Sequence, residues 1–197
     1  MQRGSCVADF RIETERLVLR DFANEADWAA FFRLTNTTAV MQWLGGVFDA
    51  EGVAAQRARI ETCAANYGHC FWLVERKADG GHLAGEVLGI CGLKRADVSG
   101  STVEGEMEVG WRFREDAWGK GYAREAAQAS LDAGFTRFGA DRIVALTIAE
   151  NTGSWGLMKR LGMRRREDLD YSDDRYDPPW RDTIIYSISR DEWEQQQ

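Results

Sequence analysis

The chain has 197 residues, a length that favours one domain over two. Hydrophobic residues make up 44% of it and charged residues 29%, a normal balance for a globular core that argues against disorder. The formal net charge of −7 disfavours nucleic acid as a partner, because nucleic-acid binding depends mainly on Lys and Arg neutralising phosphates. The same charge is compatible with a cationic partner such as an amine.

The four cysteines form no C-x-x-C pair and have no metal-ligand spacing with either of the two histidines, so we predict no metal site. Isolated cysteines fit a reducing cytosol. Residues 1–16 carry charge at both ends and no apolar stretch, unlike a signal peptide. No apolar run approaches the ~20 residues that a membrane-spanning helix requires. We therefore predict a soluble, cytoplasmic protein with no membrane partner.

The first half of the chain predicts one strand, two helices and two further strands, in that order. Residues 16–20 (RLVLR) are typical of a strand, and Asn24 is placed to cap a helix with aromatic residues at helical spacing. Asp49 is placed to cap a second helix. Residues 70–76 and 86–94 predict two further strands, and the glycines between them are those that a hairpin needs.

The clearest strand covers residues 106–113, where apolar and polar or small residues alternate with period two. Its odd positions are Met107, Val109, Trp111 and Phe113. Residues 121–138 then have the apolar periodicity of a helix, with Gly139 placed to end it. Residues 142–149 (RIVALTIA) are apolar on both faces, as in a central strand. Strand, helix and strand predict a right-handed parallel βαβ unit.

The last part of the chain predicts a short helix and two strands. The helix covers residues 152–161, and Gly162 suits its C-terminal left-handed position. Residues 163–168 and 183–189 are expected to be strands. The polar loop between them, 169–182, is longer than usual, and loops of that length often border a site.

The turn from Trp118 to Ala123 carries the strongest chemical signal. Gly119 and Gly121 flank Lys120 where the alternating strand passes into a helix. A helix N-terminus offers unpaired N–H groups and a partial positive charge, and glycines allow a phosphate to approach closely. With Lys120 and Arg124 nearby, the turn predicts a pyrophosphate site; a tight turn alone explains the glycines too. A P-loop is absent, and Arg124 replaces the third glycine of a Rossmann motif.

Several segments, in this order, resemble the GNAT acetyltransferase superfamily and, within it, the ribosomal-protein N-terminal acetyltransferases of the RimJ/RimL type. They are residues 14–20, 108–111, 118–123, 151–154, 161–163 and 186–193. The resemblance covers residues 13–194 and implies a single domain there, with residues 1–12 as an N-terminal extension and 195–197 as a tail. The implied fold is α+β: a mixed, mostly antiparallel twisted sheet of six to seven strands, with a central parallel βαβ unit and helices on both faces.

The resemblance implies acetyl-CoA as the co-substrate. In the family the amides of the turn bind the pyrophosphate, which here means Trp118, Gly119, Lys120, Gly121, Tyr122 and Ala123, with Arg124 adding charge. The preceding strand binds the pantetheine arm through the backbone around Val109, Trp111 and Phe113, at a bulge where two parallel strands splay apart. Asn151 matches an Asn that contacts the same arm, and it is also placed to cap the next helix.

The implied reaction is direct attack of an amine on the thioester in a ternary complex, with the N–H near Val109 polarising the carbonyl. Glu108 is our candidate base, with Glu106 or a water molecule as alternatives; both carboxylates are equally explained as solvated charges. Many members have a proton-donating Tyr where this chain has Met158. The RimJ/RimL branch has a serine instead, here Ser154, which also suits a helix start.

The implied acceptor is a primary amine, either a protein N-terminal α-amine or a small molecule. The family builds the acceptor site from the first two helices and the late loop, so we assign substrate binding to Trp43, Glu106 and Tyr176. Aromatic and acidic residues there suit a cationic amine, although core packing and a solvated loop explain them as well. A non-catalytic CoA-binding sensor or a nucleotide binder is the alternative. The family includes monomers and homodimers, and the sequence does not distinguish between these two states.

Overall fold

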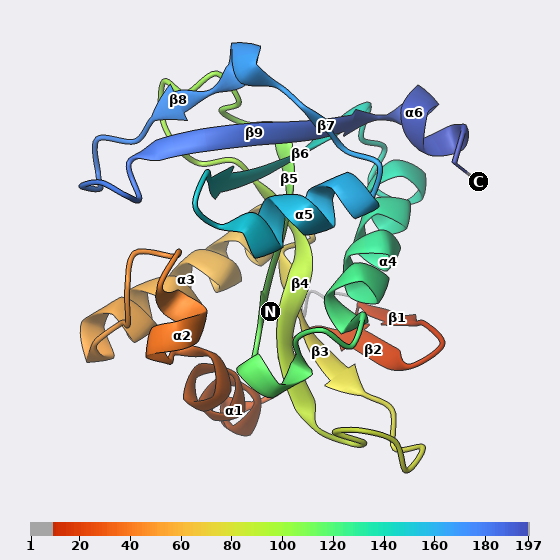
Figure 1. Cartoon of the computed structure of the whole chain (residues 1–197). Coiled ribbons are helices and arrows are strands. Elements are labelled where there is room, and N and C mark those ends of the chain that lie inside the picture. The colour runs from red at the N-terminus through yellow and green to blue at the C-terminus, as the bar shows by residue number, and fades with distance from the viewer. Residues whose placement is uncertain (1–9, 197) are drawn as a thin grey trace, which may run out of the picture.

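The structure is a computed structural model that describes residues 10–196 (Figure 1). In chain order the elements are β1 (Arg11–Glu13), β2 (Leu17–Arg20), α1 (Glu25–Thr35), α2 (Thr38–Met41), α3 (Ala50–Tyr67), β3 (Phe71–Arg76), β4 (Val87–Arg95), β5 (Met107–Phe113), the 3-10 helix η1 (Glu115–Ala117), α4 (Tyr122–Thr136), β6 (Arg142–Ile148), α5 (Thr152–Arg160), β7 (Arg164–Arg165), η2 (Glu167–Leu169), β8 (Tyr171–Ser172), β9 (Asp182–Ser189) and α6 (Arg190–Glu194).

The strands form one nine-stranded sheet in the order β1-β2-β3-β4-β5-β6-β9-β7, with β8 also paired to β9. Within the described residues β5 and β6 are the only parallel neighbours, and α4 connects them. The predicted α+β fold with a central βαβ unit is thus confirmed. The sheet has more strands than expected because β1 and β8 are only two or three residues long, too short for a periodic pattern. The strand expected over 163–168 is confined to β7, and η2 follows in place of its end. Part of the expected N-terminal extension, from Arg11, belongs to β1.

The N-terminal caps predicted from the sequence for two helices are present in the structure. Asn24 accepts a hydrogen bond from the N–H of Asp27 at α1, and Asp49 accepts one from Gly52 at α3. These bonds satisfy N–H groups that a helix start leaves unpaired. The short helices α2 and α6 were not predicted, since one turn shows no apolar periodicity.

The two faces of the sheet are covered by different helices. α1 and α3 pack their apolar side chains on one face, around Phe31, Leu73 and Ile90, while α4 packs Leu131 and Phe135 on the other. Figure 1 shows α1–α3 on one side of β4 and α4 on the opposite side. Both faces of β5 are therefore covered, which explains why its polar side chains are buried along with its apolar ones.

Gly92 in β4 marks a place where backbones approach closely. A Cβ atom there would run into the carbonyl oxygen of Cys70 and lie 2.9 Å from Cα of Phe71. Because rigid backbone cannot yield, we expect Gly92→Ala to lower the free energy of unfolding by about 1–3 kcal/mol, measured by urea denaturation. Gly156→Ala in α5, where the Cβ meets only the end of Arg160 at 3.4 Å, is the control and is expected to be neutral or stabilising.

Candidate active site

A cleft of about 1720 Å³ crosses the sheet and brings together most of the residues that the sequence singled out. It is lined from β5 and the turn after it, from the start of α5, and from the segments around residues 43 and 176. The predicted residues in its walls are Trp43, Glu108, Val109, Trp111, Phe113, Trp118, Gly119, Gly121, Ala123, Arg124, Asn151, Ser154 and Tyr176. Three others, Glu106, Lys120 and Tyr122, are not part of these walls.

The cleft lies where the two parallel strands separate. β5 and β6 pair only at Met107–Ile143 and Glu108–Val144, and beyond these residues β6 continues in register with β9. The backbone from Val109 to Phe113 therefore has β4 on one side and the cleft on the other. The splayed strands expected from the resemblance are present, but the pairing of β5 with β4 runs without a bulge, so the alternation of β5 holds to its end.

The turn after β5 has the form that the sequence predicted for an anion site. Gly121 is the N-cap of α4 with φ +81, and no side chain caps the helix, so its first N–H groups have no side-chain partner. Gly119 has φ +70, and the space where its Cβ would stand is open. The indole of Trp118 donates a hydrogen bond to the carbonyl of Phe113 at 3.0 Å and holds the turn against the strand. The geometry fits a pyrophosphate approaching an exposed helix N-terminus.

Arg16 supports this turn from the far N-terminal end of the chain, a role that no sequence pattern indicated. Its guanidinium donates to the carbonyl of Lys120 at 3.0 Å and pairs with Glu125 in the first turn of α4 at 2.7 Å. Tyr122 points away from the cleft: its ring is 3% exposed and its hydroxyl donates to the carbonyl of His82 at 3.1 Å. Tyr122 therefore has only its backbone N–H to offer a ligand.

Glu108 is buried in the cleft wall beside a lysine that the sequence analysis missed. Its Oε2 lies 2.8 Å from Nζ of Lys94, directly across the β4–β5 ladder. Burial by itself would lower the pKa of Lys94. The negative charges of Glu108 and Asp97 have the larger effect, so the pKa of the lysine is raised. Oε1 of Glu108 makes no hydrogen bond with the described residues and is not enclosed. One carboxylate oxygen is thus paired and the other is free to accept a proton.

Glu106 does not join this group. It precedes β5, where it forms an ion pair with Arg142 at the start of β6, and it lines a separate hollow beside Gly139. Glu108 lines the large cleft and Glu106 lines only this separate hollow. The assignment of Glu106 to substrate binding therefore has no geometric support.

The start of α5 forms the wall opposite β5. Asn151 caps the helix by accepting a hydrogen bond from the N–H of Ser154 at 3.2 Å, so the capping role is confirmed. Ser154 is half-buried and Met158 is buried, both in the cleft wall. Tyr171 of β8 also lines the cleft; burial, with the nearby charge of Glu108, raises its pKa to about 12. This tyrosine therefore stays protonated at neutral pH.

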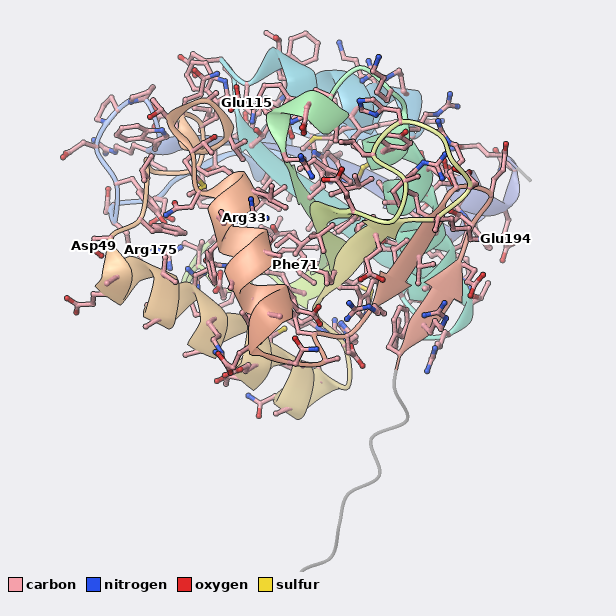
Figure 2. All side chains as sticks on the ribbon, turned by 90° about the horizontal axis from the view of Figure 1, so that it is seen from below. Arg33, Asp49, Phe71, Glu115, Arg175 and Glu194 are labelled. Atoms are coloured by element: carbon pink, nitrogen blue, oxygen red, sulfur yellow. The ribbon has the colours of Figure 1, made fainter. Side chains whose placement is uncertain are left out.

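Two loops far apart in the chain meet at one end of the cleft. The indole of Trp180 donates to the carbonyl of Gln42 at 2.8 Å, and a Cβ at Gly45 would lie 3.2 Å from the Tyr176 ring. Figure 2 shows this end of the molecule, with Asp49 and Arg175 labelled. The acidic loop is not an open negative patch, because Asp173 is buried and paired with Arg175 at 2.8 Å, and Asp170 is paired with Arg165.

The open mixed sheet with its splayed parallel strands is the fold of the GNAT acetyltransferases. Residues 16–164 match the family model described as acetyltransferase (GNAT) domain, and the chain belongs to the GNAT acetyltransferase family. The family uses acetyl-CoA as the acetyl donor. Among the described residues no His, Cys, Asp or Glu cluster could hold a metal ion, and no helix is long and apolar enough to span a membrane.

Relatives and solved structures agree with this assignment. The uncharacterized N-acetyltransferase YnaD of Bacillus subtilis (strain 168) is 31% identical over 183 residues, which cover 92% of this chain and 98% of that protein. A GNAT-family acetyltransferase from Bacillus anthracis has a TM-score of 0.71 at 28% identity, with 92% and 99% of the two chains covered. Ribosomal-protein-S5-alanine acetyltransferase from Vibrio fischeri has a TM-score of 0.70 at 19% identity and covers 94% and 99%. The last likeness concerns the fold alone.

Proposed function

We propose that this protein transfers the acetyl group of acetyl-CoA to a primary amine by direct attack in a ternary complex. The observation that carries the proposal is the position of Glu108: its free carboxylate oxygen lies in the same cleft as the uncapped N-terminus of α4. Acetyl-CoA requires an anion site for its pyrophosphate, and the amine requires a group that takes up its proton; this cleft offers both.

The acetyl donor is placed by backbone groups. The amides of residues 119–123, with the charge of Arg124, bind the pyrophosphate, and the exposed edge of β5 from Val109 to Phe113 binds the pantetheine arm. Asn151 can add a contact through its amide nitrogen, because only its oxygen is used in the helix cap. Acetyl-CoA supplies an activated acyl group, and the chain supplies position and charge.

The acceptor must lose a proton to become a nucleophile. Glu108 accepts it through Oε1, directly or through a water molecule, while Lys94 keeps the carboxylate oriented through Oε2. Ser154 lines the same cleft, and in this proposal its hydroxyl donates a hydrogen bond to the departing sulfur. The cytoplasmic location predicted from the sequence and the likeness to the RimJ/RimL branch remain predictions.

Turnover of acetyl-CoA with a panel of amines tests the proposal, with the released thiol detected by DTNB. We expect release of CoA that depends on the amine and on the enzyme. Thermal stabilisation by CoA without turnover on any amine would instead identify a CoA-binding sensor, and stabilisation by ATP or NAD but not by CoA would identify a nucleotide binder.

Ser154→Ala is expected to lower turnover about 10-fold with little change in CoA affinity, since one hydrogen bond to the leaving group is lost. Ser189→Ala is the control: it removes the cap of α6 and lowers stability by about 1 kcal/mol, but it leaves turnover unchanged. Equal turnover in Ser154→Ala and the wild type would exclude the serine from the reaction.

A further inference from the structure

Arg112 is a buried cation in the cleft wall that the proposed reaction does not use. It lies on the same face of β5 as Glu108 and is 7% exposed. Its guanidinium lies over the ring of Phe31, 4.3 Å from the centroid, and Nη1 lies 3.3 Å from Sδ of Met41. Burial lowers the pKa of Arg112 to about 10, so the side chain remains charged at neutral pH.

Two of the guanidinium donors have no partner. Nε and Nη2 of Arg112 are enclosed and make no hydrogen bond with any described residue. An aromatic face and a thioether sulfur are weak substitutes for an acceptor, and a buried, unpaired charge costs several kcal/mol. The cost indicates that these donors meet an acceptor in another state of the protein.

Two other cations of the cleft walls already have counter-ions. Lys94 pairs with Glu108 and Asp97, and Arg175 pairs with Asp173. The cleft walls hold seven Lys or Arg residues against five Asp or Glu, although the whole chain has a net charge of −7. No carboxylate of the described residues pairs with Arg112, so the missing acceptor is an anion that enters the cleft.

The free donors also select the shape of the anion. Nε and Nη2 form the side edge of the guanidinium, where two parallel N–H groups match the two oxygens of a carboxylate. Between Glu108 and Arg112 lies Gly110, and the Phe71 ring covers it closely: a Cβ at Gly110 would lie 2.8 Å from this ring. Oε1 of Glu108 reaches to 4.0 Å from the position of a Gly110 Cβ. Glu108 and Arg112 are four residues apart, so their Cα atoms are about 13 Å apart along the strand. Both side chains line the cleft, so a ligand can lie between their ends.

We propose that Arg112 binds a carboxylate of the acceptor, which makes the acceptor an amino acid or a similar small amine that carries a carboxylate. The inference rests on the proposed acetyl transfer and adds the substrate class. The amine lies at Oε1 of Glu108 and the carboxylate at the side edge of Arg112. Met41 contacts Nη1 through its sulfur and leaves the Nε–Nη2 edge for the carboxylate.

Matched acceptors test the proposal: L-amino acids and their carboxamides, which keep the amine and the side chain but lose the negative charge. We expect kcat/KM of the wild type to be at least about 30-fold higher for the carboxylates, as a bidentate, charge-assisted pair predicts. In Arg112→Gln this preference should fall to about 3-fold or less through loss of activity on the carboxylates alone. Arg112→Lys keeps the positive charge but lacks the two parallel N–H groups. Its preference for carboxylates should therefore lie between those of Arg112→Gln and the wild type.

Three further measurements separate this role from structural support. Arg112→Met should unfold at the same or a higher temperature than the wild type, because it removes an unpaired buried charge. Arg33→Gln changes an exposed arginine on α1, labelled in Figure 2, and should alter neither stability nor preference. Calorimetry should give unchanged CoA affinity in all variants.

Wild-type enzyme that acetylates carboxamides or polyamines as well as amino acids would overturn the inference and leave the proposed acetyl transfer intact. Equal loss of activity on both members of each pair in Arg112→Gln would also overturn it, since a merely structural arginine behaves that way. Failure to bind CoA or to acetylate any amine would overturn the proposed function, and this inference with it.

Discussion

Gly121→Asp is expected to weaken CoA binding at least about 100-fold in Kd, enough to abolish it at ordinary concentrations. Gly121 is the N-cap of α4, with φ +81 and an uncapped helix start behind it. An aspartate there places a negative charge within a few ångströms of the bound pyrophosphate, where two like charges at about 4 Å repel by about 4 kcal/mol near a protein surface. The new side chain also occupies the space that a phosphate needs to reach the helix amides. Isothermal titration calorimetry with CoA measures the effect.

Two control variants isolate the charge from the backbone strain. Gly121→Asn has the same size as the aspartate and tolerates a positive φ, so it should lose less affinity, about 10-fold. Gly139→Asp carries the same strain at φ +66 in an exposed position with open space around it, away from the turn, and should bind CoA normally. Normal affinity in Gly121→Asp would show that the pyrophosphate binds elsewhere.

The turn could be predicted from sequence because its signal is local. Glycines at fixed positions between an alternating strand and a periodic helix determine a backbone conformation, and the proposed pyrophosphate site consists of that conformation. The caps at Asn24, Asp49 and Asn151 are local in the same sense, and the structure confirms all three. The central strands followed from their patterns too, since burial on one face or on both leaves a period in the sequence.

The partners of charged side chains could not be predicted in the same way. Lys94 faces Glu108 only because the β4–β5 register brings them opposite each other, and register depends on the whole hairpin. Arg16 reaches the turn from more than a hundred positions away in the chain. In the sequence, Arg112 is simply one polar residue of an alternating strand. Only the packing of α1 against it shows that its side chain is buried and has no partner among the described residues.

These unpredicted partners change the view of the cleft. Aromatic and acidic residues in the late loop suggested a site for a cation, yet Asp173 and Asp170 are neutralised by neighbouring arginines. The structure adds one carboxylate oxygen on Glu108 that makes no hydrogen bond with the described residues, and one guanidinium edge on Arg112 that is buried without a partner among them. A proton acceptor beside an anion site fits an amine with a carboxylate better than a polycation.

Glu108→Gln is expected to lower kcat at least about 100-fold while CoA affinity changes by less than about 3-fold. The amide of glutamine accepts no proton, and a positioned base contributes about 10²–10⁴-fold to rate. Lys94 keeps Asp97 as a partner at 3.1 Å, so the variant should fold normally. Steady-state kinetics with DTNB, measured across pH, and calorimetry with CoA give the two quantities separately.

Glu106→Gln is the matched control, because it removes a carboxylate only two positions earlier on the same side of the strand. That carboxylate pairs with Arg142 and lies outside the cleft, so its loss should leave kcat near that of the wild type. Equal losses in the two variants would mean that the charge of the strand, rather than a proton acceptor, supports turnover. Wild-type turnover of Glu108→Gln at every pH would remove Glu108 from the mechanism and leave water as the base.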